Sequence, residues 1–323
     1  MNINNTIILT GSAGFIGFHV TSKLLQMGHQ IVGIDNLNDY YEVSLKLARN
    51  SILQKNKDFY FEKANIANQE ELNAVLSKYK AKKIIHLAAQ AGVRKSLTDP
   101  FIYEESNIKG FLNILESAKK YKINQIVFAS SSSVYGENKM NLGGFSEKDK
   151  VSKPISFYGG TKIANELMAY TYSHLYGINC TGLRFFTVYG PWGRPDMAYF
   201  KFTKAIIEGK PIDIYNKGEM KRDFTYIDDI VDGVIKAIDK EYTYEIFNLG
   251  NSLTVELLHF LKCLENLLNK QANINFMPLQ PGDVLETYAN IDHSKQKLGF
   301  NPTTKIEDGL KNFVKWYKDY YRI

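Results

Sequence analysis

Two side chains in the middle of the chain are spaced so that they could transfer a proton together. Tyr158 and Lys162 are four residues apart, which places a phenol and an ammonium on one face of a helix. The cation favours the phenolate, so Tyr158 would act as a base at a pH below its reference pKa of about 10. Because the chain has 21 tyrosines, such a pair also arises by chance. Its position relative to the other motifs must decide whether it is functional.

Four consecutive serines, Ser130 to Ser133, follow an apolar run at 125–129 that is typical of a buried strand. In an open parallel sheet the ligand lies outside the carboxyl ends of the strands. We therefore expect these hydroxyls to face the same ligand as Tyr158. The alternative is that the serines form an exposed loop.

A glycine-rich turn, TGSAGFIG, follows the first apolar run. Gly11, Gly14 and Gly17 allow a tight turn into a helix whose N-terminus can bind a pyrophosphate. Asp35, at the end of the next expected strand, can accept the ribose hydroxyls and would repel a 2′-phosphate, which favours NAD over NADP. Asn65-Ile66 follows the third strand, where an adenine edge could be met. The alternative is an ordinary turn, with Asp35 as a helix cap.

The elements that must position these groups alternate between short β-branched runs and amphipathic segments. This alternation predicts an α/β fold with a doubly wound parallel sheet. We expect strands at 6–10, 30–34, 59–61, 83–87, 125–129, 180–185 and 245–249, and helices near 15–28, 69–79, 104–121, 157–176 and 228–239.

The second half of the chain is richer in loops, since six of the eight prolines lie beyond residue 190. Loops commonly carry binding groups. We expect a cofactor-binding domain at 1–189, with a return segment at about 225–250, and a smaller, interleaved α/β substrate lobe at 190–323.

Composition excludes several classes of protein. The 323 residues include 44% hydrophobic residues, and 40 basic against 34 acidic residues give a net charge of +6. The basic residues are scattered, which argues against nucleic-acid binding. Cys180 and Cys263 form no CxxC pair, so we expect neither a disulfide framework nor a metal. No apolar stretch approaches the ~18 residues of a membrane span, and no leader is evident at the N-terminus. We expect a cytoplasmic protein.

These motifs together resemble the extended short-chain dehydrogenase/reductase superfamily, which has a Rossmann fold. The resemblance rests on TGSAGFIG, Asp35, the serine strand end and the Tyr158-x-x-x-Lys162 spacing, and it covers essentially the whole chain. Within the superfamily, the strings at 86–94, 186–197 and 222–229 are most similar to those of UDP-glucuronate 4-epimerases.

The resemblance implies a role for each site residue. Tyr158 is the catalytic base and acid, Lys162 lowers its pKa and holds the nicotinamide ribose, and Ser131 is the catalytic hydroxyl. The NAD site comprises Gly11, Gly14, Phe15, Ile16, Gly17, Asp35, Asn36, Asn65, Ile66, Leu87, Ala88, Ala89, Tyr158 and Lys162. The UDP-sugar site comprises Arg94, Ser132, Ser133, Thr187, Arg194, Phe202, Arg222, Gln280 and Asp283. A homodimer through helices near 104–121 and 160–176 is also implied.

The site residues favour epimerisation within this superfamily. Related dehydratases carry an Asp-Glu pair where this chain has Ser132 and Ser133, and related decarboxylases keep a glutamate near this strand end. Arg194 offers a planar fork for a carboxylate, although a diphosphate contact or a plain surface position is the alternative. Gln280 stands where galactose epimerases commonly have Arg. The alternatives are a UDP-glucose or UDP-N-acetylhexosamine 4-epimerase, and a non-catalytic NAD-binding protein.

Overall fold

The computed structural model describes residues 6–138, 140, 143–278 and 286–323. Its largest sheet has seven strands, all paired in parallel, in the order β11-β6-β5-β4-β1-β2-β3. The strands are β1 (Thr6–Thr10), β2 (Gln30–Asp35), β3 (Phe59–Lys63), β4 (Lys83–His86), β5 (Gln125–Ser131), β6 (Asn179–Phe185) and β11 (Tyr244–Leu249). The order reverses between β1 and β4, and a ligand crevice is expected at such a switch point.

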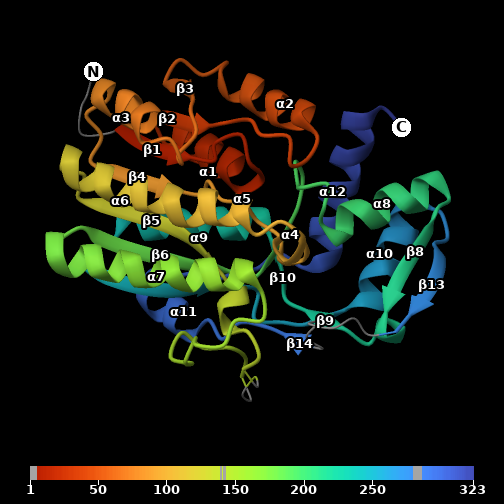
Figure 1. Cartoon of the computed structure of the whole chain (residues 1–323). Helices are drawn as coiled ribbons and strands as arrows, with labels where there is room; N and C mark the ends of the chain where they lie inside the picture. Colours follow the sequence, from red (N-terminus) through yellow and green to blue (C-terminus); the bar gives the residue numbers. More distant parts are fainter. Residues whose placement is uncertain (1–5, 139, 141–142, 279–285) are drawn as a thin grey trace.

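Helices cover both faces of this sheet because its strands are apolar on both faces. In β1, Ile7 and Leu9 join one buried cluster and Ile8 joins the other. One face is covered by α3 (Gln69–Lys78), α6 (Gly110–Tyr121) and α7 (Phe157–Tyr176), and the other by α1 (Phe15–Gln26), α9 (Ile227–Asp239) and α11 (Asp292–Leu298), with α2 (Val43–Leu53) beside α1 (Figure 1). The doubly wound parallel sheet that the sequence predicts is confirmed.

The boundaries differ from the expected ones in two places that matter for the site. Strand β5 runs through Ser131, so Ser130 and Ser131 are buried strand residues and the exposed-loop alternative is wrong for both. A 3-10 turn, η3 (Ser132–Tyr135), then follows directly. The helix expected at 104–121 is composite: a π-helical turn, η2 (Glu104–Lys109), leads into α6. The short helices α4 (Val93–Thr98) and α5 (Phe101–Tyr103) come before this range.

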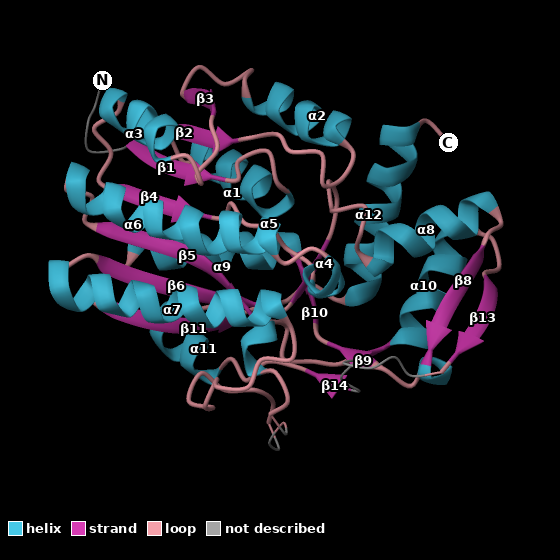
Figure 2. Ribbon diagram, in the orientation of Figure 1, coloured by secondary structure: helices cyan, strands magenta, loops and turns pink. Residues whose placement is uncertain are grey.

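The remaining elements form a smaller lobe, on the right of Figure 2. Its helices are α8 (Ala198–Glu208), α10 (Leu257–Leu268) and α12 (Ile306–Tyr321). Two strand pairs belong to this lobe: β8 (Pro211–Tyr215) with β13 (Asn273–Met277), and β7 (Thr187–Tyr189) with β10 (Phe224–Tyr226). A three-stranded sheet has β9 (Lys221–Arg222) between β12 (Val255–Glu256) and β14 (Glu286–Thr287). A short turn, η4 (Asn216–Gly218), follows β8. Helix α9 and strand β11 come after β10 in the chain yet pack with the large sheet, so the two parts are interleaved.

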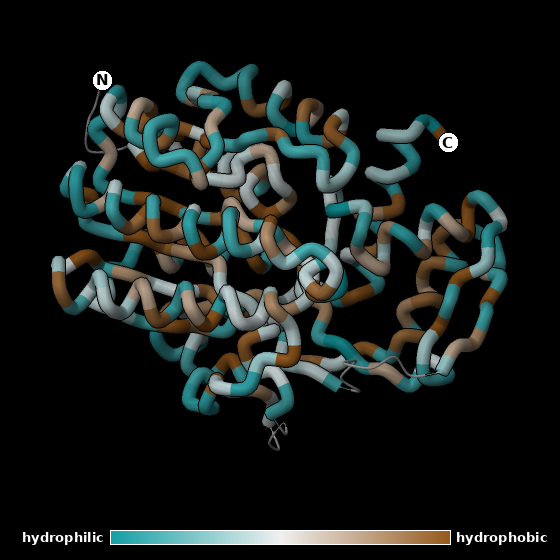
Figure 3. The backbone as a smooth tube through the Cα atoms, viewed as in Figure 1, coloured by the Kyte–Doolittle hydropathy of each residue, from teal (hydrophilic) through white to brown (hydrophobic). Residues whose placement is uncertain are grey.

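The hydrophobic residues follow these layers. In Figure 3 brown segments run along the central strands, while the outer helices alternate between teal and brown along their length. One buried cluster extends from Leu9 of β1 to Phe313 of α12, so the two parts share a core. Among the described residues, no helix combines the length and the apolar character that crossing a membrane requires.

Candidate active site

A cavity of about 250 Å³ opens at the carboxyl ends of β1, β2, β4 and β5. All fourteen positions of the expected NAD site line it, as do Ser131 and Arg194. The sheet order explains the convergence, because the glycine turn after β1 and the serines of β5 lie on either side of the switch point. Residues from across the first 200 positions of the chain therefore meet in one place.

The glycine turn is tight enough to require glycine at its first and third positions. Gly11 has φ +76°, and a Cβ there would lie 2.7 Å from the Ala88 nitrogen. A Cβ at Gly17 would lie 2.0 Å from the Gly11 carbonyl oxygen. Gly14 is the residue before α1, and no side chain caps that helix. The N–H groups of the first turn of α1 are thus positioned to bind an anion in the cavity.

Asp35 ends β2 at the cavity, with both carboxylate oxygens held by the backbone. Oδ2 accepts from the Ala13 amide at 3.1 Å and Oδ1 from the Leu37 amide at 2.8 Å. Burial raises the pKa of Asp35 above its ordinary value, and the Leu37 amide is the strongest of the groups that oppose the rise. Each oxygen keeps a second lone pair, so a diol can be bound at this position.

Asn36, Asn65 and Ile66 lie beyond Asp35 on the same side of the cavity. The Asn65 side chain accepts from the Ala67 amide at 3.0 Å, which turns the chain away from β3. Ile66 is buried, and it presses on α6 because a Cβ at Gly110 would lie 2.9 Å from its Cδ1. This part of the wall thus combines a polar amide with an apolar side chain.

Tyr158 and Lys162 project from the first two turns of α7 into the other end of the cavity. The Tyr158 phenol hydrogen-bonds the Ser131 hydroxyl, and the Lys162 ammonium lies 6.0 Å from the centre of the Tyr158 ring. Burial raises the pKa of Tyr158, and the Ser131 hydrogen bond and the charge of Arg194 oppose that rise. The structure thus brings the phenol together with the hydroxyl and the cation that the sequence grouped with it, but the net pKa of Tyr158 is raised instead of lowered because burial outweighs the opposing contacts.

Lys162 is fully enclosed, and its ammonium donates to the Ala129 carbonyl of β5 at 2.7 Å. Burial lowers its pKa to about 8, while the Glu166 carboxylate one turn later raises it. The start of α7 is fixed by two serines: Ser156 accepts from the Gly159 amide at 3.0 Å, and Ser96 accepts from the Tyr158 amide at 3.2 Å.

Arg194 reaches the cavity from the loop after β7. Its Nε and Nη2 donate to the two oxygens of Asp196, with the Nε contact at 3.0 Å. Burial alone lowers the pKa of Arg194, but the Asp196 carboxylate outweighs it and the net pKa is raised. The guanidinium is therefore a fixed cation whose Nη1–Nη2 edge can bind a second carboxylate or phosphate.

Apart from Arg194, the expected sugar-site residues that the structure describes lie outside the lining of this cavity. Ser132 and Ser133 are the first two residues of η3, and the Ser133 hydroxyl accepts from the Ser131 hydroxyl at 3.2 Å. Thr187 begins β7 beside Phe224 of β10. Phe202 is half-buried against the core, with its ring centre 6.4 Å from that of Phe260.

Two of the expected basic residues are also elsewhere. The Arg94 guanidinium lies 5.3 Å from the centre of the Tyr215 ring, and Arg222 in β9 donates to the Lys221 carbonyl at 2.9 Å. Gln280 and Asp283 lie outside the described residues.

The structure adds residues that the sequence patterns did not single out. Lys46 lines the cavity and donates to the Asn38 carbonyl oxygen at 2.7 Å. Buried Asn107, in the π-helical turn η2, donates to the Gln90 carbonyl at 3.0 Å and to Thr161 at 3.1 Å, which ties α7 to the cavity wall. A π-helical turn often marks a functional position, but no sequence signal shows one here.

Buried Arg49 of α2 is the third addition. It donates to the carbonyls of Ala13 at 2.9 Å, Trp192 at 2.6 Å and Gly193 at 3.0 Å. It thereby joins the glycine turn to the loop that carries Arg194. An arginine on an amphipathic helix ordinarily lies exposed. Trp192 is also 143 residues away in the chain, so no sequence pattern indicates this contact.

Comparison with known proteins gives consistent results. Residues 7–250 match the model of the NAD dependent epimerase/dehydratase family. The chain is 48% identical to protein CapI of Staphylococcus aureus over 98% of this chain and 99% of that one. It is 46% identical to UDP-glucuronate 4-epimerase 4 of Arabidopsis thaliana, covering 98% of this chain and 76% of that protein.

A solved structure is also similar over its whole length. The crystal structure of UDP-glucuronic acid 4-epimerase from Bacillus cereus in complex with UDP-glucuronic acid and NAD superposes with a TM-score of 0.91 at 35% identity, covering 98% of this chain and 100% of that one. The glycine turn, the serine strand end and the tyrosine–lysine pair thus lie in a fold shared with an NAD-binding enzyme. The chain belongs to the NAD dependent epimerase/dehydratase family.

Proposed function

We propose that the chain is an NAD-dependent 4-epimerase that interconverts UDP-glucuronate and UDP-galacturonate through a transient 4-keto sugar. The observation that carries the proposal is the meeting of the Tyr158–Ser131 hydrogen bond, Lys162 and Arg194 in the cavity that the glycine turn and Asp35 also line. The relatives and the solved structure that bear this activity in their names support the choice of substrate.

The cavity fits NAD at each of its polar groups. The uncapped start of α1 would bind the pyrophosphate, and Asp35 would accept hydrogen bonds from the adenosine ribose. Lys162 would hold the nicotinamide ribose. A Cβ at Gly11 would lie 2.7 Å from the Ala88 nitrogen, so the turn leaves no room for a side chain at this position. Bound NAD⁺ supplies a hydride acceptor for C4 of the sugar that can return the hydride to the other face.

The chain's own residues manage the proton at O4. Tyr158 accepts this proton as the ketone forms, and it donates the proton back after the ring has turned. Ser131 holds the phenol and the same sugar oxygen in line. Ser132 and Ser133 carry no carboxylate, so the site lacks the acid–base pair that elimination of a hydroxyl would need. The reaction therefore ends in a change of configuration without net oxidation.

Arg194 provides the selectivity for a uronate. Asp196 occupies one edge of its guanidinium and fixes the plane of the other edge. We place the glucuronate carboxylate on that second edge. The 4-keto uronate is a β-keto acid, which loses carbon dioxide when its carboxylate bond aligns with the ketone, and a rigid contact at Arg194 would hold the bond out of alignment.

The direct test is to incubate the purified chain with UDP-glucuronate and follow the sugar by proton NMR. We expect a mixture of the two C4 epimers without accumulation of NADH. Tyr158→Phe should abolish the conversion, whereas Tyr170→Phe, an exposed position on the same helix, should not. Pentose products, or conversion of UDP-glucose and UDP-N-acetylglucosamine but not of UDP-glucuronate, would contradict the proposal.

We also propose that the protein is a homodimer that pairs through α6 and α7. These neighbouring helices expose the large apolar side chains Leu112, Leu167, Tyr170 and Leu175. Leu167→Glu with Leu175→Glu should halve the mass measured by light scattering, whereas Leu253→Glu, at an exposed site on another face, should not. A monomeric wild type would refute this. The cytoplasmic location stays a prediction, which cell fractionation would test.

A further inference from the structure

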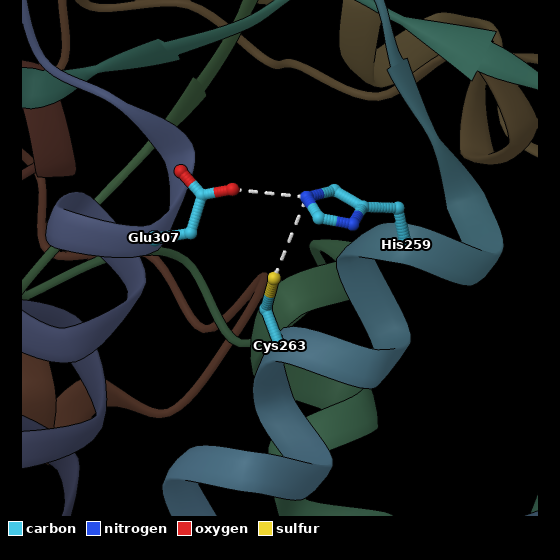
Figure 4. A group of neighbouring side chains, drawn as sticks. All are labelled: His259, Cys263 and Glu307. Carbon is cyan, nitrogen blue, oxygen red and sulfur yellow. Dashed lines mark hydrogen bonds and ion pairs between the residues drawn. The ribbon is translucent and has the colours of Figure 1, made fainter.

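Three side chains that commonly bind metals converge in the smaller lobe, away from the active site. His259 and Cys263 are one turn apart on α10, and Glu307 lies in the first turn of α12 (Figure 4). None of these three residues lines the active-site cavity. The described residues contain one such group of histidine, cysteine and carboxylate.

The distances between the donor atoms suit a small tetrahedral ion. His259 Nε2 lies 3.6 Å from Cys263 Sγ and 3.0 Å from Glu307 Oε1, and all three atoms lie within 4.8 Å of one another. Ordinary zinc bond lengths in a tetrahedron separate nitrogen from sulfur by about 3.5 Å and nitrogen from oxygen by about 3.3 Å. The two distances to His259 Nε2 therefore match within a few tenths of an ångström, and the sulfur–oxygen separation, which is below 4.8 Å, would have to reach about 3.6 Å.

A simple ion pair explains only part of this arrangement. His259 and Glu307 are both half exposed, so their pairing alone is an ordinary surface contact. The thiol is a third donor directed at the same ring nitrogen, as Figure 4 shows. His259 and Glu307 also line a cleft of about 930 Å³, which gives an ion and its water ligands a path from solvent.

We propose that His259, Cys263 and Glu307 bind Zn²⁺ through Nε2, the thiolate and the carboxylate, with water as the fourth ligand. A ligand set of thiolate and imidazole favours zinc over magnesium or calcium, which prefer oxygen. On binding, the S–H bond of Cys263 gives way to a sulfur–metal bond, and the proton leaves to solvent. The ion would fasten α10 to the start of α12 and stabilise the smaller lobe.

Cobalt titration of the full chain tests the proposal, because Co²⁺ replaces Zn²⁺ and is visible by absorption. The protein is first treated with a chelator and a reductant, and then passed into metal-free buffer. We expect one equivalent of Co²⁺ to produce a thiolate-to-metal charge-transfer band, and Zn²⁺ to displace it. Zn²⁺ should also raise the Tm of the wild type. Absence of the band at excess Co²⁺ would overturn the proposal.

Variants show whether the signal arises at this site. Cys263→Ser should remove the band, and His259→Ala should weaken Co²⁺ binding at least about tenfold, since losing a mere supporting contact costs 10–100-fold. His293→Ala is the matched control: it breaks a similar pair, with Nε2 3.3 Å from Glu245 Oε1, that has no thiol. It should keep the band and the affinity. A band that survives Cys263→Ser would also refute the site. If Cys263→Ser fails to fold, Glu307→Gln is the second test, and it should weaken Co²⁺ binding.

Discussion

Arg184 and Glu166 form a buried, two-pronged ion pair beneath the serine end of β5. Arg184 Nε lies 2.9 Å from Glu166 Oε1 and Nη2 lies 2.7 Å from Oε2, and Ser130 donates to the same carboxylate at 2.5 Å. Glu166 is one turn beyond Lys162 on α7. The pair therefore fixes the rotation of α7 against β5 and β6, and with it the direction of Tyr158 and Lys162.

Breaking this pair should destabilise the protein strongly. Arg184→Met leaves the Glu166 carboxylate buried without its cation, and such a loss typically costs about 3–5 kcal/mol. We expect Arg184→Met with Glu166→Gln to recover part of the loss, because no uncompensated charge then stays buried. Urea unfolding of the two single variants and the double variant measures this coupling. If the single effects simply add, the pair does not act as a unit.

Removing the Ser131 hydroxyl should move the pH dependence of the reaction. The Ser131 hydrogen bond lowers the pKa of Tyr158 against the effect of burial. The phenolate accepts the proton, so activity rises as pH rises through this pKa. Ser131→Ala should raise the pKa and shift the ascending limb of kcat/KM to higher pH, with a lower rate at neutral pH. The measurement is the pH profile of kcat/KM for Ser131→Ala and for Ser77→Ala, an exposed control on α3 whose ascending limb should stay where it is in the wild type. An unshifted limb with reduced kcat would give Ser131 a different role.

Arg194 should decide between uronate and neutral sugars. Hydrogen bonds to charged groups contribute about 1.5–3 kcal/mol, so Arg194→Met should lower kcat/KM for UDP-glucuronate at least about tenfold. The same change should affect UDP-glucose much less. We also expect a 4-keto pentose among the NMR signals, because the carboxylate is no longer held out of alignment. Arg194→Lys keeps the charge without the fork and should recover little. Equal losses with both sugars would assign Arg194 to the diphosphate.

The parts of the site that the sequence predicted are those encoded by short spacings. The glycine turn, Asp35 and the Tyr158–Lys162 pair can be recognised because each depends on one strand end or one helical turn. The sequence places the serines after the end of a strand at 125–129, whereas β5 runs on through Ser131. These motifs follow strands of one parallel sheet, so the sheet itself brings them to the same edge.

The parts that the sequence did not predict depend on pairs far apart in the chain. Arg49 meets Trp192, and His259 meets Glu307, only after the smaller lobe has folded. A search for CxxC spacing does not detect one histidine and one cysteine at helical spacing that meet a carboxylate from another helix. The Arg194–Asp196 pair is the exception, since its partners are two residues apart; the sequence does not show the loop conformation that brings them together.

Arg49 should couple cofactor binding to substrate binding. It bonds the glycine turn at Ala13 and the loop before Arg194 at Trp192 and Gly193. Arg49→Met would leave these carbonyls without donors, and an unsatisfied buried group costs about 1–3 kcal/mol. We expect lower stability together with higher KM values for both NAD⁺ and UDP-glucuronate and a smaller change in kcat at saturation. Arg49→Lys, with one donor group in place of the fork, should recover only part of this, and Arg322→Met near the C-terminus should behave as wild type. Lower stability with unchanged KM values would limit Arg49 to a structural role, because only the coupling of the turn to the loop requires both constants to rise.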